Sequence, residues 1–342
     1  MKVKFLVTPV GLMMGNIESA DRLKDALARE GLEVTDNLDS EDFDVLHVHT
    51  PVPMRNISVV KKAKRRGIPV VMHAHTTAED SKGTWSGSTA LAGITGMYLT
   101  HFYNLGDLVL APSAWTKSTL EARGVAVPVK VLSNGVDLAR FKFDKERRKR
   151  FRSRYGIPDQ SVVAYAIGVV CIKKGVEAFP RVARELPDLR FVWVGRGSML
   201  YHPLRVSRAM RHCPQNATFI HNVEDIADAH CGCDIFFTPS FAENQGMAVM
   251  EAMAVGRAVV ARDLPAYEGL LMNGRSALLC NDDHAFVAAL DRVRKEKNLA
   301  QALVANGRTA IEEHDICKVA KELATIYDSL LEKTSAQNDV YT

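Results

Sequence analysis

The sequence predicts an α/β protein made of two doubly wound parallel sheets. Three observations support this fold class. A chain of 342 residues is long enough for two domains. Its hydrophobic content of 47% and charged content of 25% are typical of a globular protein with real cores. Short apolar runs alternate with helical patterns along both halves, and the runs are uninterrupted, as expected of parallel strands covered by helices on both faces.

The first half begins with a strand and a helix. The opening apolar run is broken by Pro9, Gly11 and Gly15 and leads at once into a helical pattern, so it is a strand rather than a signal peptide. The helix that follows carries apolar residues from Ile17 to Leu27 on one face and closes at Gly31. The predicted strands of this half are Val3–Val7, Val45–Val48, Pro69–Met72, Leu108–Ala111 and Val129–Leu132.

A basic stretch near 140–158 ends at Gly156-Ile-Pro158 and predicts the boundary before a second alternating series. Helices are expected near 175–186, 203–212, 224–230 and 246–255. From 283 to about 333 the chain reads as helical, and the polar tail from Ser335 is expected to fray. The predicted strands are Val162–Ile167, Arg190–Val194, Ala217–Ile220, Asp234–Thr238, Ala258–Ala261 and Ala277–Leu279.

The cysteine pattern and the apolar runs further limit the class of protein. The six cysteines form no C-x-x-C pair, so buried free thiols in a reducing compartment are expected. Eighteen consecutive apolar residues occur nowhere, so no membrane span is expected.

The net charge is only +4, but basic residues cluster at 61–66 and 145–154. The second cluster has seven positive residues, and either a solvated helix face or attraction to anionic lipid headgroups would explain it.

Two carboxylates lie eight residues apart in the segment 239–256. Glu251 is the only charge on an otherwise apolar helix from Gly246 to Gly256, where an ionised carboxylate is costly unless it is paired or hydrogen-bonded. Glu243 lies where a strand passes into this helix, so its side chain and free backbone N–H groups can face a ligand together. A core helix with one glutamate paired to an arginine would show the same spacing.

This segment resembles the E-x7-E signature of retaining family 4 glycosyltransferases, including the Pro239-Ser240 that precedes the first glutamate. The resemblance covers nearly the whole chain and is strongest from 130 to 275. It implies the GT-B fold, in which two Rossmann-like domains face a cleft. The expected parts are an acceptor-side domain at 1–150, a nucleotide-sugar-binding domain at 151–316 and a helix at 317–334 that returns to the first domain.

The resemblance also implies roles for individual residues of the segment. Glu243 would lie against the donor sugar and act in catalysis, and Glu251 would bind the ribose hydroxyls of the nucleotide. The residues that lead into the helix, Asn244, Gln245 and Gly246, would belong to the same donor-binding block.

A second element resembles the Lys-Gly motif that grips the donor diphosphate in this family. Lys174, just before Gly175 at a helix start, matches the key lysine, and Lys173 is the second candidate for this role. An arginine commonly follows the strand's glycine in the family, but here Gly168 is followed by valine. Lys173 or Arg196 is therefore expected to take its place.

Three glycines complete the expected donor site. Gly195 and Gly197 flank Arg196 after a strand, in a turn that would let the nucleotide pack against backbone. Gly11 belongs to the loop after the first strand, which flanks the diphosphate and the acceptor in the resembled family. The Ser133–Asp137 segment resembles the family's N-G-V-D turn, and its role is interpreted as structural.

Two His-x-His units end neighbouring strands. The segment His73–Asp80 resembles the histidine loop of the family and is similar to that of diacylglycerol glucosyltransferases; His75 is the expected catalytic residue. His47 and His49 end the preceding strand and could line the same crevice. Two His-x-His units could bind a metal as a pair. Taking alternate strand residues to point to opposite faces, however, each unit would offer one ligand, so no metal is expected. Lysines and helix N-termini can neutralise the diphosphate without a metal cofactor, and Asp42-Phe-Asp44 reads as a solvated turn.

The expected function is hexose transfer with retention from a nucleotide diphosphate sugar, UDP-glucose first, to a membrane lipid such as diacylglycerol. The basic cluster and the aromatic-containing region Gly83–Tyr103 would hold the protein peripherally on an anionic membrane, on the cytoplasmic face. A core helix face carrying Leu91, Ile94, Met97 and Tyr98 is the competing interpretation of that region. The alternatives are a soluble or polysaccharide acceptor, or a non-catalytic nucleotide- or nucleic-acid-binding protein. The basic runs lack interleaved aromatics, so no nucleic-acid partner is expected.

Overall fold

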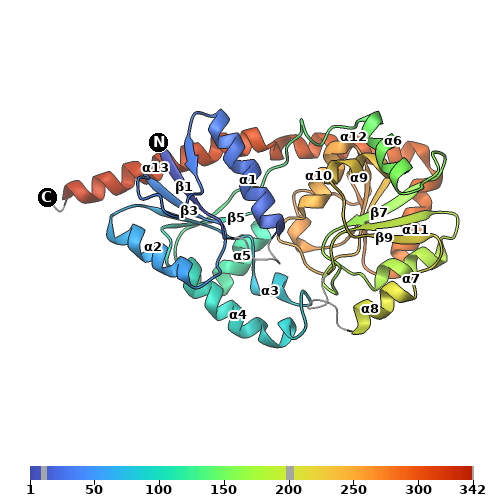
Figure 1. Ribbon diagram of the computed structural model, residues 1–342, viewed down its shortest axis with the longest axis horizontal. Helices are drawn as coiled ribbons and strands as arrows, with labels where there is room; N and C mark the ends of the chain where they lie inside the picture. Colours follow the sequence, from blue (N-terminus) through green and yellow to red (C-terminus); the bar gives the residue numbers. More distant parts are fainter. Residues whose placement is uncertain (9–13, 198–203, 341–342) are drawn as a thin grey trace. The chain divides into compact units, whose positions relative to one another are not determined.

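The computed structural model describes residues 1–8, 14–197 and 204–340 (Figure 1). Internal contacts divide the chain into two units. Unit 1 comprises Met1–Ala78, Gly93–Gly135 and His314–Thr342, and unit 2 comprises Glu79–Ala92 and Val136–Glu313. Within the described residues, each unit folds around one six-stranded sheet. All pairings between the strands of both sheets are parallel, as predicted.

The sheet of unit 1 has the order β2-β1-β3-β4-β5-β6. Its order reverses between β1 and β3, which is a topological switch point of the flavodoxin-like kind. Strands β3, β4 and β5 are buried along their whole length, which explains their uninterrupted apolar runs. The strands are β1 (Lys2–Leu6), β2 (Glu33–Thr35), β3 (Val45–Val48), β4 (Val70–His73), β5 (Leu108–Ala111) and β6 (Val129–Val131).

Helices cover both faces of this sheet. On one face α1 (Met14–Arg29) packs with α13 (Ile316–Val340), and the two helices share an apolar cluster with the sheet through Leu23, Leu323 and Tyr327. The C-terminal helix therefore belongs to unit 1, as the family resemblance implies. The other face packs against α2 (Arg55–Arg65), α4 (Ser88–Tyr103) and α5 (Ala114–Ala122). The short α3 (Ala78–Ser81) follows β4.

Unit 2 has the sheet order β12-β11-β10-β7-β8-β9, the Rossmann order with its switch point between β7 and β10. The strands are β7 (Val163–Ile167), β8 (Arg190–Val194), β9 (Ala217–Ile220), β10 (Ile235–Thr238), β11 (Ala258–Arg262) and β12 (Leu278–Cys280). The helices are α6 (Lys145–Arg154), α7 (Ala178–Glu185), α8 (Leu204–Arg211), α9 (Ile226–Gly232), α10 (Met247–Val255), α11 (Asp283–Lys295) and α12 (Lys297–Ile311), with the 3₁₀ turns η2 (Pro265–Tyr267) and η3 (Glu312–His314).

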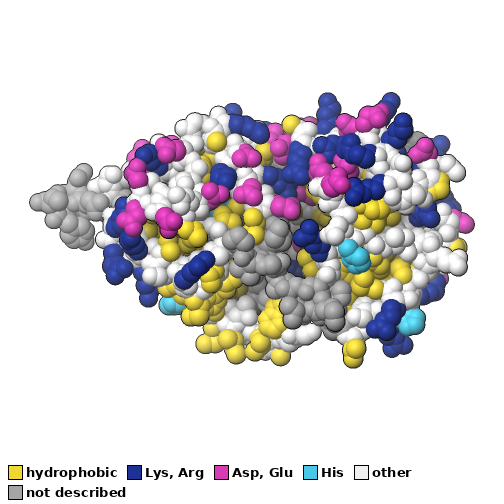
Figure 2. Space-filling model, in the orientation of Figure 1, with side chains coloured by type: hydrophobic (Ala, Val, Ile, Leu, Met, Phe, Trp, Pro, Cys, Tyr) yellow, Lys and Arg dark blue, Asp and Glu magenta, His cyan; other side chains and the backbone are white. Residues whose placement is uncertain are grey.

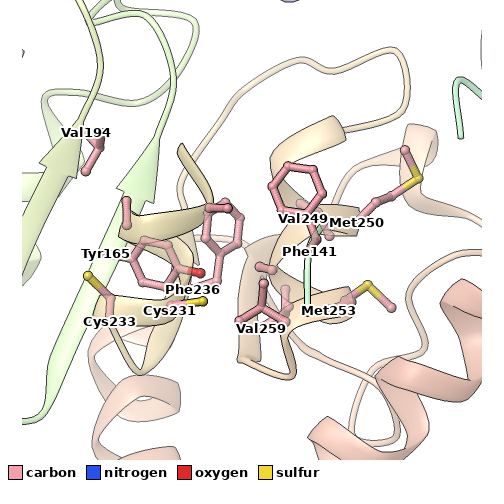
Figure 3. Close-up of a cluster of buried hydrophobic side chains, with 14 of the residues drawn as sticks. Phe141, Tyr165, Val194, Cys231, Cys233, Phe236, Val249, Met250, Met253 and Val259 are labelled. Atoms are coloured by element: carbon pink, nitrogen blue, oxygen red, sulfur yellow. The ribbon is translucent and has the colours of Figure 1, made fainter. Parts of the chain in front are cut away.

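Two apolar clusters fill the two faces of the second sheet. One cluster joins Tyr165 and Phe236 of the sheet to Met250 and Met253 of α10 and to Cys231 of α9 (Figure 3). The other packs α7, α11 and α12 against the opposite face. All six cysteines are free thiols, four of them buried, in agreement with the sequence prediction.

Most of the basic side chains of helix α6 form ion pairs with carboxylates of unit 2. It lies in unit 2, and its arginines alternate with carboxylates on the surface (Figure 2). Arg152 is only 1% exposed and contacts Asp234, and Arg147 contacts both Asp225 and Asp228. The remaining arginine pairs are Arg148–Asp234, Arg150–Asp228 and Arg154–Glu224. Five of the seven charges are thus used within the unit to attach α6 to its neighbours.

Helix α4 carries apolar side chains on both its buried side and its solvent-facing side. Of the aromatic rings expected at a membrane interface, Phe102 and Tyr103 are buried in the core, whereas Trp85 and Tyr98 are half-buried. The side chains turned to solvent are aliphatic: Ile94 is 66% and Met97 76% exposed, and Leu91 is exposed as well. Figure 2 shows hydrophobic side chains gathered over this helix. None of the described helices combines the length and hydropathy that crossing a bilayer requires.

Candidate active site

The loops that follow β7 and β10 meet at the switch point of unit 2. Ligands of open α/β sheets bind at such a point, beyond the carboxyl ends of the strands. The loop after β7 carries Lys173 and Lys174, and the loop after β10 carries Glu243. The backbone N–H of Phe241 donates to the carbonyl oxygen of Lys173 at 2.7 Å, which joins the two loops directly. The sheet topology thus brings together two elements that are about seventy residues apart in sequence.

Lys174 and Glu243 form the central ion pair of this site. The ammonium Nζ of Lys174 lies 2.6 Å from Oε1 of Glu243, and both side chains are largely buried. Burial alone would raise the pKa of Glu243, but the charges of Lys174 and Lys173 outweigh it and hold that pKa below its usual value. Glu243 therefore stays ionised, and one ammonium group is poised beside it.

Lys173 points to a different carboxylate. Its Nζ lies 2.9 Å from Oδ1 of Asp80, in the segment Glu79–Ala92 that groups with unit 2. Burial would lower the pKa of Lys173, but Asp80 and Glu243 outweigh it and raise that pKa. The backbone N–H of Lys173 also donates to the carbonyl oxygen of Gly83 at 3.0 Å. Lys173 thus connects Asp80, at the end of the His73–Asp80 segment, to the loop that follows β7.

Two glycines let the strand-end loops approach closely. Gly175 has φ +77°, and an added Cβ would lie 2.2 Å from the carbonyl oxygen of Pro239. At Gly195 an added Cβ would lie 1.9 Å from the carbonyl oxygen of Gly168. No other residue fits these two positions. Gly197 is half-buried at the end of the same turn, whereas Gly11 lies outside the described residues.

The helix α10 places Glu251 in the interior of unit 2. Glu251 is 4% exposed, and its Oε2 lies 3.3 Å from Nε2 of His230 on α9. The other ring nitrogen of His230 lies 2.7 Å from the hydroxyl of Tyr165. Among the described residues, His230 is therefore one protein partner of this carboxylate. His230 was missed in the sequence because a single histidine on a short helix carries no pattern of its own.

The start of α10 is closely packed. Gly246 has φ +86°, and a Cβ there would lie 2.6 Å from the ring of Tyr267. Asn244 and Gln245 are both buried beside it. The predicted donor-binding residues of this segment are thus brought together with Glu243 at one end of the helix.

Four buried histidines stack at the switch point of unit 1. Nδ1 of His49 lies 3.0 Å from Nε2 of His75, and Nδ1 of His73 lies 3.3 Å from Nε2 of His47. The rings of His73 and His75 are parallel, with centroids 4.0 Å apart. The prediction that each His-x-His unit offers one side chain to this point is wrong. Residues two apart on a strand share a face, so both units contribute both histidines.

Two further residues close this histidine cluster. His73 donates from Nε2 to Oδ1 of Asn134 at 3.1 Å, and Nδ1 of His47 lies 2.5 Å from the hydroxyl of Tyr327 on α13. Burial lowers the pKa of all four histidines, to about 4 for His73, so the rings are neutral. Asn134 lies in the turn that the sequence indicated as structural only. It contacts the cluster, which no local pattern could indicate.

Comparison with known proteins places the chain in a family. Residues 171–296 match the model of group 1 glycosyl transferases, and residues 19–140 match that of glycosyltransferase family 4. The chain is 27% identical to the processive diacylglycerol alpha-glucosyltransferase of Acholeplasma laidlawii over 90% of its own length and 91% of the relative's. It is 29% identical to the alpha-galactosylglucosyldiacylglycerol synthase of Streptococcus pneumoniae, over 73% and 68% of the two chains.

Solved structures confirm the fold. The crystal structure of HepE from Anabaena, determined in complex with UDP-glucose, matches with a TM-score of 0.76 at 17% identity, over 96% of this chain and 100% of that one. At this identity the likeness speaks for the fold alone, and that fold is GT-B. The matched domains and the relatives confirm the resemblance seen in the E-x7-E segment: the chain is a glycosyltransferase and belongs to glycosyltransferase family 4.

Proposed function

We propose that this enzyme transfers glucose from UDP-glucose to a membrane lipid such as diacylglycerol, with retention at the anomeric carbon. The observation that supports the sugar-donor part of this proposal is the Lys174–Glu243 ion pair at the switch point of unit 2. The acceptor half rests on the two relatives, which are named as enzymes that glycosylate diacylglycerol lipids. The first is named an alpha-glucosyltransferase, and an α-linked product from an α-linked donor means retention.

Unit 2 is the proposed donor side. A diphosphate bound near Lys174 would share its ammonium group, which lies 2.6 Å from Glu243 in the free protein. Electrostatic stabilisation of the leaving diphosphate by such a preorganised cation is usually the largest single contribution to lowering the activation barrier. Glu243 would then face the sugar and its developing positive charge, while Glu251 accepts hydrogen bonds from the ribose. Lys173, Gly195, Gly197, Asn244, Gln245 and Gly246 complete this proposed site, together with Gly11 of unit 1.

Unit 1 is the proposed acceptor side, and His75 its catalytic residue. His75 is neutral and held on one side by His49, so its ring orientation is fixed. A neutral imidazole can accept the proton of an acceptor hydroxyl or bind a sugar hydroxyl. The nucleotide sugar is a substrate, and Lys174 supplies the positive charge at the diphosphate, so the transfer step itself is proposed to need neither metal nor cofactor.

Membrane attachment is proposed to be peripheral, on the cytoplasmic face, and to use the exposed aliphatic face of α4. Leu91, Ile94 and Met97 follow one another at intervals of three residues and so lie along one side of the helix. An apolar face open to solvent marks an interaction surface. The arginines of α6 contribute little to this attachment, because intramolecular carboxylates neutralise them.

An assay with a panel of donors and acceptors tests the function. The purified protein is given UDP-glucose, UDP-galactose or GDP-mannose with diacylglycerol vesicles or with soluble sugars, and products are identified by mass spectrometry. Glucosyl-diacylglycerol with an α linkage is the expected product. Transfer to soluble or polysaccharide acceptors alone would overturn the lipid assignment, and UDP binding without transfer to any acceptor would favour a non-catalytic nucleotide-binding protein.

A further inference from the structure

The buried histidine cluster of unit 1 has the arrangement of a metal site. One ring nitrogen from each of His47, His49 and His73 lies within 4.8 Å of the others. These three side chains are at most 2% exposed. Nε2 of His49 is buried and has no hydrogen-bonding partner among the described residues. A buried lone pair without a donor is costly, which calls for a ligand.

The outer nitrogens of the three rings are already engaged. Nδ1 of His47 lies 2.5 Å from the hydroxyl of Tyr327, Nδ1 of His49 lies 3.0 Å from Nε2 of His75, and Nε2 of His73 donates to Asn134. Histidines that bind a metal nearly always donate their other ring N–H to such a partner. With the outer nitrogens protonated, the lone pairs left are those on Nε2 of His47, Nε2 of His49 and Nδ1 of His73.

The separation of two of these nitrogens fits a shared ion. Nε2 of His47 and Nδ1 of His73 are 3.3 Å apart. Two imidazole ligands at about 2.0–2.1 Å from zinc, at a tetrahedral angle, are about 3.3–3.4 Å apart. A hydrogen bond between the two neutral rings would also fit this distance, but it leaves His49 Nε2 without a partner.

We propose that His47, His49 and His73 bind one borderline divalent cation, with zinc the best match. Three imidazoles suit zinc, cobalt, nickel and copper and do not suit magnesium or calcium, which prefer oxygen. Three protein ligands leave a fourth position for solvent. The ion joins the ends of β3 and β4 and, through Tyr327, the C-terminal helix. The proposal does not depend on the proposed function.

Zinc loading of the full, untagged chain tests the site. The protein is stripped with a chelator, equilibrated with zinc, desalted and measured by mass spectrometry of the metal. About one zinc per chain is expected for the natural protein and for His101→Gln, a control at an exposed histidine of α4. His49→Gln should lose the zinc. Bound cobalt should give the visible spectrum of a four- or five-coordinate imidazole centre.

A second variant keeps the test decisive if His49→Gln does not fold. Tyr327→Phe retains the ring in the core and removes only the hydroxyl beside His47, and it should weaken zinc affinity roughly tenfold or more. Absence of zinc from the natural protein, retention of zinc by folded His49→Gln, or unchanged affinity in Tyr327→Phe would each overturn the proposal and leave a hydrogen-bonded histidine cluster. None of these readouts involves glycosyl transfer, so the outcome does not bear on the proposed function.

Discussion

Glu251 and His230 are joined side chain to side chain in the core of unit 2, with 3.3 Å between Oε2 and Nε2. His230 is in turn 2.7 Å from the hydroxyl of Tyr165. A carboxylate in this position is oriented by the protein before any ligand arrives. Its energetic cost of burial is already offset, so the proposed contact with a ribose would need no reorganisation of this side chain.

Glu251→Gln should weaken UDP binding by about tenfold, because a hydrogen bond from a ribose hydroxyl to a carboxylate is stronger by about 1.4 kcal/mol or more than one to an amide. Isothermal titration calorimetry with UDP measures the effect. Glu268→Gln, at an exposed glutamate of the same unit, is the matched control. Equal UDP affinity in folded Glu251→Gln and in the control would exclude the ribose-binding role.

Lys174→Ala should lower the affinity for UDP more than the affinity for uridine. The reason is that the ammonium group would bind the diphosphate and leave the nucleoside untouched. Titration of both ligands into Lys174→Ala and into Lys149→Ala, an exposed lysine of α6, separates the two effects. A parallel loss for UDP and uridine would show that Lys174 only supports the loop.

Gly175→Ala should cost more than about 3 kcal/mol of the free energy of unfolding, because it combines strained backbone with a clash against Pro239. Gly269 provides the control, since it has φ +82° but no atom within 4 Å of an added Cβ. Gly269→Ala should cost about 1 kcal/mol, from the backbone alone. Denaturant unfolding followed by circular dichroism gives both numbers. A similar cost for the two would mean that the loops do not need their close approach.

The ion pairs of α6 should make unit 2 sensitive to acid. Burial alone would raise the pKa of Asp225, but Arg147, the N–H of Ala227 and Arg140 outweigh it and lower the pKa from 3.8 to about 2. A carboxylate with a lowered folded-state pKa stabilises the fold above its unfolded pKa and loses that effect as the pH falls through the folded value. The contribution should therefore be complete above pH 3.8 and vanish toward pH 2.

Asp225→Asn isolates this charge, because asparagine can still cap α9 through its side-chain oxygen. The variant should lose up to about 1 kcal/mol of stability at neutral pH and low salt, and less at high salt. Thermal unfolding between pH 2 and pH 7 measures the difference from the natural protein. A difference that persists unchanged at the lowest pH would contradict an electrostatic origin.

Membrane binding should depend on α4 and not on α6. Ile94→Glu with Met97→Glu places two charges on the exposed aliphatic face and should abolish sedimentation with anionic vesicles. Lys145→Ala with Lys149→Ala removes the two charges of α6 that form no ion pair with the part of the chain that the structure describes, and it should change binding little. If the α4 variant binds vesicles normally while the α6 variant does not, the attachment surface is the basic helix after all.

Local apolar patterns in the sequence predicted most of the fold. They could not predict which side chains contact one another in the folded protein. Strand β8 was predicted at Arg190–Val194 with both ends correct, because its residues are buried on both faces and turn signals flank it. Strand β2 was missed: Glu33–Thr35 is a short, half-exposed edge strand with no apolar run. The arginines of α6 were interpreted as free charges, because their carboxylate partners lie about eighty residues further along the chain.

For the candidate site, too, the sequence indicated individual residues but not the contacts between them. Lys174 and Glu243 were singled out by motif, and their direct contact follows from the sheet order, which the residues alone do not state. The roles assigned to them stay predictions. His75 was placed at a strand end, but the gathering of four histidines with Asn134 and Tyr327 joins four separate segments, and only the tertiary fold brings those together.

The position of α13 has a consequence for biosynthesis. The helix leaves the ribosome after all of unit 2, yet Leu323 and Tyr327 fill the core beside β1 and α1, which precede unit 2 in the chain. Until residues 316–331 emerge, one apolar face of the first sheet remains uncovered while all of unit 2 is being synthesised. At about 5–20 residues per second, that interval is on the order of ten seconds or more. A nascent chain of this enzyme is therefore a natural client for chaperones, and ribosome-stalled or C-terminally truncated chains should aggregate through unit 1.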